Sequence, residues 1–397
     1  MTAASGAARE RALGRFLSVA DFEREAARRL PRLVHAFVSG GVEDEVTLRA
    51  NRAAFERLML RPRGFAGVSD IRQEVELWGR CYASPIGIAP MGVTAICRRD
   101  CDLELARAAR AAGIPFILSG VSTYPLEELE RQAPGTWYQG YLPGDTDRLG
   151  RILGRLERAG IDVLVVTCDT PVAGNRENNI RNGFAIPFRP SLRLALDGLA
   201  HPRWLVEVLA RTLVTSGVPR FANLYEEMGP AITSEPKQGF RGGRDLFTWE
   251  HMSWIRERWP GRLAVKGVLH PADAREAAAR GMDAIIVSNH GGRQLDGALP
   301  SILALGDVVK AVPDGFPVMI DSGFRRGSDV LKAVALGARL VFMGRPFLYG
   351  AAVGGEAGAL RVCDILKAEI ARNLALLGVP DLRCLDEGTL VPMPPRA

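Results

Sequence analysis

Short runs of apolar residues alternate with amphipathic stretches over most of the chain. From Pro85 onward these runs are too apolar for surface loops and too short for helices, which is typical of inner strands of a parallel sheet. Amphipathic segments with the spacing of one helix face follow them, and several of these segments end at glycine. The pattern predicts strands at 86–89, 116–118, 137–139, 163–167, 263–266, 284–288, 318–321 and 340–343.

The segments between and after these strands have the length and pattern of helices. We expect helices at 100–112, 126–132, 146–159, 271–280, 302–311 and 328–336, and a longer final helix at 356–377. Repeated strand–helix units favour a parallel sheet with helices outside it, and eight such units close a barrel. The sequence therefore predicts an α/β protein with a (β/α)8 TIM barrel.

Two parts of the chain depart from this repeat. Helices at 19–37 and 43–58, followed by an irregular stretch at 60–77, predict an N-terminal helical cap. After the fourth strand, residues 188–245 form a long insertion with a basic amphipathic stretch, which can cover the barrel, act as a lid or lie on a membrane. The expected boundaries are a flexible tail at 1–17, one domain at 18–380 and a C-terminal tail at 381–397.

The composition is that of an ordinary globular protein, with 397 residues, 47% of them hydrophobic and 24% charged. The net charge of +6 is mild and the arginines are interspersed with acids, so we expect no nucleic-acid partner. The cysteines are dispersed and the histidines lack zinc-site spacing, which predicts no metal and a reduced, cytoplasmic compartment. No stretch resembles a signal peptide or a membrane span.

The candidate chemistry lies at the C-terminal ends of the strands, which converge on one mouth of such a barrel. His290 can exchange a proton near neutral pH, and Arg293 can clamp a carboxylate with two parallel hydrogen bonds. An isolated histidine in a turn is more often structural. Here, however, other strand ends also carry polar side chains, which include Gln139, Tyr141, Thr167, Asp169, Arg176 and Lys266. The set predicts a site that oxidises or deprotonates a small acid.

The last two strand ends predict a phosphate site. Asp-Ser-Gly-Phe-Arg-Arg-Gly at 321–327 precedes a helix that starts near Ser328, so backbone N–H groups and a helix N-terminus are expected to face the ligand. In the next loop, Gly344 permits close approach and Arg345 supplies charge. These two loops are where such barrels commonly hold a phosphate.

Ser-Asn-His-Gly-Gly-Arg-Gln at 288–294 resembles the signature of the FMN-dependent 2-hydroxy acid dehydrogenases and oxidases. The resemblance extends from about residue 18 to 380. It includes Leu-Pro-Arg at 30–32, Gly-Gly-Val-Glu-Asp-Glu at 40–45, Arg-Pro-Arg at 61–63, Val-Lys-Gly-Val at 265–268, the segment from 321 to 330 and Gly344-Arg345. The segments 201–204 and 321–326 are most similar to mandelate and L-lactate dehydrogenases.

This resemblance implies that the protein oxidises a 2-hydroxy acid to the 2-oxo acid. It assigns His290 as the base that takes the hydroxyl proton while the C2 hydrogen leaves as hydride for the flavin N5, and Asp169 as the carboxylate that orients His290. Arg176 and Arg293 are implied to bind the substrate carboxylate, and Tyr141 to hydrogen-bond the substrate oxygen.

The same resemblance implies a bound FMN. Lys266 is expected beside the flavin N1 and O2, where its charge favours the anionic reduced ring. Asp321 is expected at the ribityl chain. Gly323, Arg325, Gly344 and Arg345 are expected at the phosphate. The other expected cofactor contacts are Pro90, Met91, Gly92, Ser119, Gln139, Thr167, Ser288 and Ser322.

Two positions refine the resemblance. The family usually has a tyrosine where this chain has Phe37, and a lost charge-assisted hydrogen bond is worth about 1.5–3 kcal/mol. The substrate is then bulkier or more apolar, with a natural-product intermediate as one option, or the two arginines hold its carboxylate alone. Gly92 is typical of members that pass electrons to quinones or proteins, whereas oxidases tend to have alanine. This favours a dehydrogenase and leaves oxygen open as the acceptor.

Other expectations and alternatives accompany this interpretation. The resemblance implies a homotetramer and, through residues 188–245, peripheral contact with the inner face of a membrane. An FMN-dependent isomerase on a similar barrel would instead need a basic diphosphate pocket and no net redox change. A flavin-binding protein without turnover is a third possibility, against which the complete acid–base set argues.

Overall fold

The protein is an eight-stranded parallel barrel, described by a computed structural model at residues 11–189, 191–235 and 243–393. The sheet has the order β4-β11-β10-β9-β8-β7-β6-β5, and a parallel bridge between Ile88 and Phe116 joins its two edges. The strands are β4 (Ile86–Ile88), β5 (Ile117–Ser119), β6 (Trp137–Gly140), β7 (Val163–Thr167), β8 (Arg262–Val268), β9 (Ala284–Val287), β10 (Val318–Ile320) and β11 (Leu340–Met343). The predicted barrel is confirmed, and each strand lies within two residues of its expected bounds.

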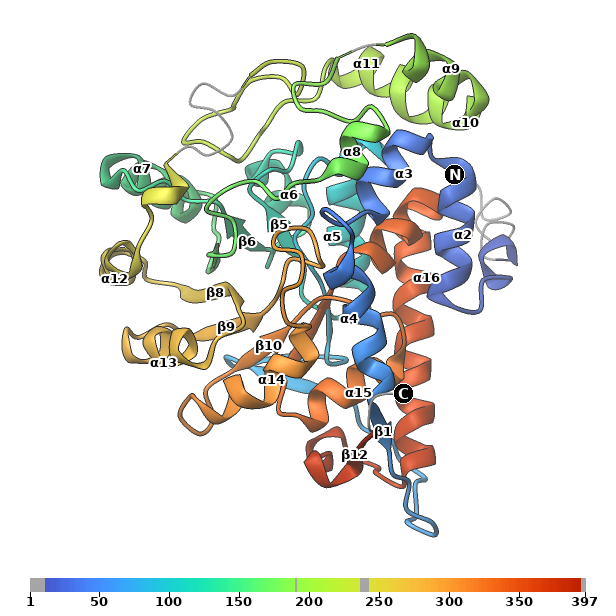
Figure 1. Cartoon of the computed structure of the whole chain (residues 1–397), viewed down its shortest axis with the longest axis vertical. Coiled ribbons are helices and arrows are strands. Elements are labelled where there is room, and N and C mark those ends of the chain that lie inside the picture. The colour runs from blue at the N-terminus through green and yellow to red at the C-terminus, as the bar shows by residue number, and fades with distance from the viewer. Residues whose placement is uncertain (1–10, 190, 236–242, 394–397) are drawn as a thin grey trace.

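Eight helices cover the outside of the barrel (Figure 1). They are α5 (Cys101–Ala112), α6 (Leu126–Gln132), α7 (Thr146–Arg158), α12 (Trp249–Arg258), α13 (Pro271–Ala279), α14 (Ser301–Lys310), α15 (Gly327–Ala335) and α16 (Arg345–Leu377). The sequence did not indicate α12, in which only Met252 and Ile255 are buried. The final helix starts earlier than expected and bends at Gly355, whose φ is 58°.

The barrel strands are short and buried because side chains fill the interior and helices cover the outside. Every residue of β7, β9 and β11 is buried. The register of β7 with β8 sets Thr167 opposite Lys266 at the C-terminal end of the pair. A register shift between Lys266 and Val268 follows directly, so the β8 strand changes direction where the polar residues begin.

The N-terminal cap consists of α2 (Val19–Arg29), α3 (Arg32–Ser39) and α4 (Val46–Glu56). The expected single helix over 19–37 is wrong, because Pro31 has no N–H to donate and the chain turns there between α2 and α3. The α2 helix packs on α16. The cap therefore lies against the last strand–helix unit of the barrel.

The described parts of both expected tails are packed on the barrel. Leu13 and Phe16 are buried in the main core and do not belong to a flexible tail. At the other end, β12 (Leu390–Pro392) pairs antiparallel with β1 (Leu58–Leu60). The C-terminal segment also contains η4 (Leu382–Cys384) and η5 (Glu387–Thr389), and a small hairpin of β2 (Val75–Leu77) and β3 (Arg80–Tyr82) completes the cover.

The insertion after β7 carries several short helices, of which α9, α10 and α11 lie at the top of Figure 1. They are α8 (Glu177–Arg181), α9 (Leu192–Ala200), α10 (Pro202–Trp204), η2 (Leu205–Ala210, a π-helix), α11 (Arg211–Ser216) and η3 (Arg244–Leu246). The Trp204 indole donates a 2.7 Å hydrogen bond to the Ile96 carbonyl in η1 (Thr94–Ile96), so the insertion is fixed to the loop that follows β4.

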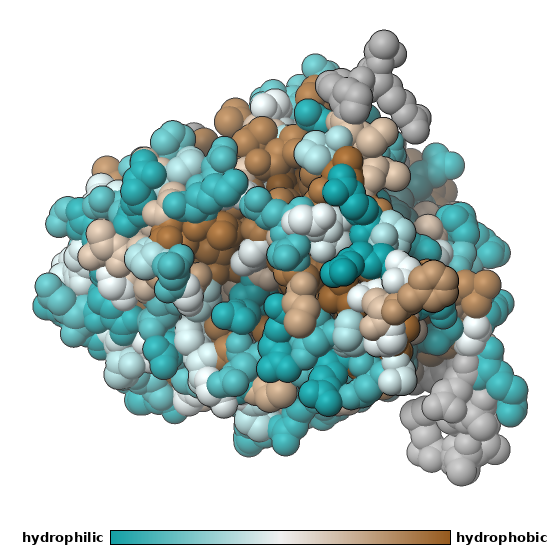
Figure 2. Space-filling view, turned by 90° about the horizontal axis from the view of Figure 1, so that it is seen from below, coloured by the Kyte–Doolittle hydropathy of each residue, from teal (hydrophilic) through white to brown (hydrophobic). Residues whose placement is uncertain are grey.

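The insertion exposes many large apolar side chains, which include Leu192, Leu196, Leu199, Val206, Leu213 and Val214. The opposite end of the molecule differs, since its surface is mainly hydrophilic and its apolar residues lie largely in recesses (Figure 2). Among the described residues, no helix has the length and apolar character needed to cross a bilayer.

Candidate active site

The loop after β9 holds His290 in a fixed, left-handed backbone conformation with φ 58°. The Ser288 hydroxyl accepts a 3.0 Å hydrogen bond from the His290 N–H. Gly292 has φ 72°, and a Cβ there would lie 2.7 Å from the Leu48 nitrogen in α4. The glycine therefore lets the loop pass close to the cap, and a non-glycine residue with positive φ marks strain at a functional position.

His290 is paired with Asp169, which follows β7. The imidazole Nδ1 lies 2.9 Å from the Asp169 carboxylate oxygen, and the two side chains are only 18% and 13% exposed. Burial opposes ionisation of Asp169, but His290 and Lys266 hold its pKa below the ordinary value. Burial lowers the pKa of His290, with Asp169 opposing, so the imidazole is neutral near pH 7 and can accept a proton.

Tyr141 lies on the other side of the imidazole. Its hydroxyl is 3.4 Å from the His290 Nε2. The guanidinium of Arg244 is 4.4 Å from the centre of the Tyr141 ring, within the range of a cation–π interaction. Burial raises the pKa of Tyr141, so the phenol keeps its proton and can donate a hydrogen bond.

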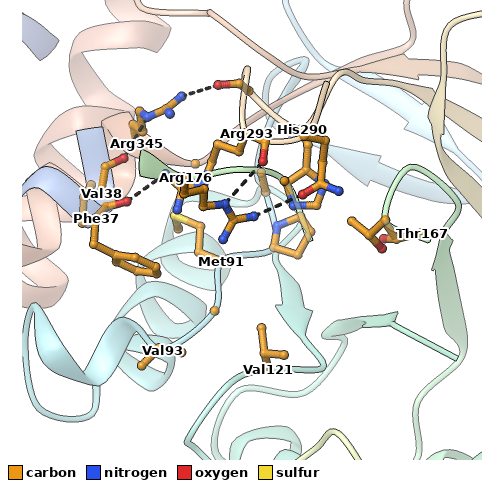
Figure 3. Close-up of a pocket in the computed structure, with 18 of the residues that line it drawn as sticks. Phe37, Val38, Met91, Val93, Val121, Thr167, Arg176, His290, Arg293 and Arg345 are labelled. Carbon is orange, nitrogen blue, oxygen red and sulfur yellow. Dashed lines mark hydrogen bonds between the residues drawn. The ribbon is translucent and has the colours of Figure 1, made fainter. Parts of the chain in front are cut away.

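Arg176 and Arg293 form a positive patch beside His290 (Figure 3). Arg293 donates 2.8 Å hydrogen bonds to the carbonyls of Phe37 and Gly40, and Arg176 donates to the Arg293 carbonyl and to Gln294. Neither guanidinium has a carboxylate partner within the described part of the chain. Burial and the neighbouring arginines lower the pKa of Arg293 well below its usual value. The pair is thus a site for an anion.

Lys266 lies at the bottom of the mouth, 3.1 Å from the Asp321 carboxylate and 2.9 Å from the Ser288 hydroxyl. Burial opposes its charge, but Asp321 and Asp169 hold the pKa of Lys266 above its ordinary value. On its other side, Gln139 donates a 2.9 Å hydrogen bond to Thr167. Ser119 in turn donates a 3.1 Å hydrogen bond to the side-chain Oε1 of Gln139. Lys266 is therefore a fixed cation beside a row of oriented amide and hydroxyl groups.

The last two loops are arranged differently from the expectation. The backbone N–H groups of Arg325 and Arg326 donate to Asp329, and that of Gly327 donates to Glu369, so the N-terminus of α15 is already capped. These three N–H groups are therefore not free for a phosphate, whereas Asp321, Ser322, Gly323 and Arg325 of the same loop line the cavity. The N-terminus of α16, with Gly344 and Arg345, faces the cavity instead.

Arg345 supplies the charge at this end. Its guanidinium donates to the carbonyls of Val38, Gly40 and Gly291, which fixes the loops and the cap around it (Figure 3). Burial lowers the pKa of Arg345 to about 10. Arg325 lies in the same cavity and is 3.8 Å from Glu23 of α2.

A cavity of about 740 Å³ unites these groups, and this volume is within the range of about 300–1,000 Å³ that is typical of small-molecule sites. The expected site residues that line it are Phe37, Pro90, Met91, Gly92, Gln139, Tyr141, Thr167, Arg176, Lys266, His290, Arg293, Asp321, Ser322, Gly323, Arg325, Gly344 and Arg345. Asp169, Ser119 and Ser288 lie behind this wall and bond to residues in it.

Several cavity residues were not expected from the sequence. They are Val93, Val121, Phe184, Ile186, Phe221 and Arg244. All lie in loops or in the insertion, where the sequence has no periodicity that would show which side chains point into the cavity. Phe184 stacks on Phe37 with ring centres 4.3 Å apart, and Val93 and Phe221 belong to a small apolar cluster that also contains Ile232.

Comparison with known proteins matches this chain to one family over most of its length. The model of the FMN-dependent dehydrogenases matches residues 26–392. The (S)-mandelate dehydrogenase of Pseudomonas putida is 40% identical over 369 residues, which cover 93% of this chain and 92% of that protein. An L-lactate dehydrogenase of Azorhizobium caulinodans is 37% identical over 384 residues, which cover 94% and 98% of the two chains.

A solved structure is similar as well. The crystal structure of the monotopic membrane protein (S)-mandelate dehydrogenase superposes with a TM-score of 0.85 at 37% identity, covering 96% of this chain and 100% of that one.

Proposed function

The chain belongs to the family of FMN-dependent dehydrogenases, and from this premise we propose that His290 is the catalytic base in the oxidation of a 2-hydroxy acid. The protein is an FMN-dependent enzyme that acts on 2-hydroxy acids. The observation that carries the proposal is the 2.9 Å pair of His290 and Asp169, next to two arginines that have no carboxylate partner among the described residues.

The chain's own residues bind two groups of the substrate, its carboxylate and its hydroxyl. Arg176 and Arg293 bind the substrate carboxylate and thereby set its hydroxyl toward the imidazole. Tyr141, with its hydroxyl 3.4 Å from the imidazole, donates a hydrogen bond to the same substrate oxygen. His290 then removes the hydroxyl proton, and Asp169 stabilises the imidazolium that forms.

The cavity fits FMN in charge and in space. Arg345, buried without a carboxylate partner in the described residues, and Arg325 provide the phosphate end, and Lys266 provides a cation at the flavin ring. Gln139, Thr167 and Ser119 would hold the polar edge of the ring, with Pro90, Met91, Gly92, Ser288, Asp321, Ser322, Gly323 and Gly344 as the remaining contacts. When bound, FMN would supply the acceptor for the C2 hydrogen and its electron pair, which the oxidation of the hydroxyl to a carbonyl requires.

The walls beyond the carboxylate site favour an aryl or other bulky apolar side chain. Phe37 stacks on Phe184 at one wall, and Val93, Phe221 and Val121 pack together at another. Figure 3 labels Phe37, Val93 and Val121. Because Phe37 replaces the tyrosine that the family usually has, the two arginines alone hold the carboxylate. An aryl 2-hydroxy acid such as mandelate fits these walls better than lactate.

The insertion supports peripheral membrane contact and a membrane-soluble electron acceptor. Its exposed apolar side chains on α9, η2 and α11 form a surface that can enter the headgroup region of a bilayer. A relative of the same fold is described as a monotopic membrane protein. Gly92, at the flavin site, further favours a quinone over oxygen. The resemblance also supports a homotetramer, which sedimentation of the FMN-loaded protein tests.

The proposal is tested by anaerobic rapid mixing of the FMN-loaded protein with 2-hydroxy acids. We expect mandelate to bleach the flavin faster than lactate, with one 2-oxo acid formed per flavin. Re-oxidation by a quinone analogue should be faster than by oxygen, and binding to anionic vesicles should need the insertion. Formation of a rearranged product with no net bleaching would support an isomerase instead, and a flavin that no hydroxy acid reduces would contradict the proposal.

A further inference from the structure

Arg244 is a cation in the cavity to which the chemistry above gives no role. It comes from η3, at the end of the insertion, and its side chain lines the same cavity as His290. Lys266 is paired with Asp321, Arg325 approaches Glu23, Arg345 serves the phosphate end, and Arg176 with Arg293 serves the substrate carboxylate.

Arg244 has no acidic partner within the part of the chain that the structure describes; its recorded contact is the face of the Tyr141 ring, at 4.4 Å. The neighbouring stretch 236–242 contains no Asp or Glu. A guanidinium that is largely removed from water and lacks an anion is unfavourable, because its five N–H donors lose hydration without full replacement. Such a group in a binding cavity is matched by an acceptor on the ligand.

Arg244 has different neighbours from the arginines of the carboxylate site. Burial lowers the pKa of Arg244 while Tyr141, Tyr225 and Tyr138 raise it. By contrast, the pKa of Arg293 is lowered by burial and then by Arg176 and Arg345. Arg244 thus has tyrosines as its electrostatic neighbours, and its guanidinium lies over the ring of Tyr141, whose hydroxyl approaches the His290 Nε2.

We propose that Arg244 binds an acceptor oxygen at the far end of the substrate's side chain, so that the preferred substrate is a 2-hydroxy acid with an apolar, aryl-sized body and a remote carboxylate or carbonyl. The apolar body of the substrate packs against Val93, Val121 and Phe221, and Arg244 donates hydrogen bonds to the remote oxygen. The inference rests on the proposed oxidation of 2-hydroxy acids. It adds a polar contact to the apolar residues proposed to hold the substrate's side chain.

The test compares size-matched substrates on the FMN-loaded enzyme. Anaerobic flavin reduction is measured with 4-carboxymandelate, 4-acetylmandelate and 4-isopropylmandelate, of which the last has no acceptor oxygen on its ring substituent. Arg244→Met is expected to lower the ratio of second-order reduction constants, carboxy over isopropyl, about tenfold to a hundredfold. Arg244→Lys should retain most of the preference for the carboxylate and lose more of that for the neutral carbonyl.

Arg151→Met is the matched control, because Arg151 is an exposed arginine that pairs with Glu226 outside the cavity. FMN content and melting temperature verify that each variant is folded. A ratio that is unchanged in Arg244→Met overturns the inference, whether both rates fall in parallel, as for a residue that only positions Tyr141, or neither falls. If no compound bleaches the wild-type flavin, the proposed function fails. Binding of the same compounds, followed by flavin absorbance, then still measures the Arg244 preference.

Discussion

Replacement of Asp169 by asparagine removes the charge behind the proposed base while keeping the size of the side chain. The carboxylate oxygen is 2.9 Å from the His290 Nδ1, and both side chains are largely buried. During proton abstraction the imidazole becomes positive, so the carboxylate stabilises the product of that step more than its reactants. Asp169→Asn should therefore slow flavin reduction rather than weaken substrate binding.

Two energies give the size of the expected increase in activation free energy for Asp169→Asn. A hydrogen bond to a charged group is worth about 1.5–3 kcal/mol. The Coulomb energy of unit charges about 4 Å apart at an effective dielectric constant of about 20 is about 4 kcal/mol. A loss of about 2–4 kcal/mol corresponds to a rate that is roughly 30-fold to 1,000-fold lower.

The assay is anaerobic stopped-flow reduction across pH, with substrate affinity taken from the concentration dependence. Because Asp169 raises the pKa of His290, loss of the Asp169 charge should move the rising limb of the plot of reduction rate against pH to lower pH. Asp102→Asn is the control, since Asp102 is a buried acid that accepts a hydrogen bond from Ser122 outside the cavity lining. Reduction of Asp169→Asn within about threefold of the wild type, or a limb displaced to higher pH, would refute the reasoning.

Three further replacements test other parts of the site. Arg293→Lys loses the planar fork and should raise the substrate dissociation constant about tenfold to a hundredfold, measured by flavin reduction; an unchanged constant would contradict the carboxylate role. Lys266→Met leaves buried Asp321 unpaired, and urea unfolding should show a loss of about 3–5 kcal/mol, which an unaltered midpoint would exclude. A Cβ on Gly92 would lie 2.2 Å from the Val121 Cγ2, so Gly92→Ala should cost about 1–3 kcal/mol in the same assay, and adding Val121→Ala should restore most of it.

The barrel could be predicted because its signal is local. Each strand is a short apolar run, and most helices between them have a clear apolar stripe and a glycine at their end. Where the stripe is weak the prediction failed, as for α12, whose described burial is limited to Met252 and Ile255. The break between α2 and α3 could have been read from Pro31, since a proline that deep in a helix interrupts it.

What the sequence could not reveal depends on partners far along the chain. The pairing of β1 with β12 joins segments that lie far apart along the chain. The capping of α15 by Asp329 is local, but the bond from Gly327 to Glu369 is not, and together they occupy the N–H groups that were expected at a phosphate. Arg244 is likewise one arginine among many in the sequence, and only the folded insertion brings it over Tyr141.

The functional residues were predictable as a group because they follow the strand ends. His290 and Arg293 follow β9 and Asp169 follows β7, yet the barrel topology requires these two loops to meet. The apolar side of the cavity was not predictable, because Phe184 lies in the loop before the insertion and Phe221 within it, where the sequence has no repeating pattern. The chemistry of the site was therefore clearer from the sequence than the shape of its substrate pocket.

The central claim is that His290 takes the hydroxyl proton of the substrate at the mouth of the barrel. The most direct measurement is anaerobic mixing of FMN-loaded His290→Gln with mandelate, followed at the flavin absorbance. We expect this variant to remain yellow and to bleach about 10²-fold to 10⁴-fold more slowly than the wild type. Bleaching at the wild-type rate would contradict the assignment of His290 as the base.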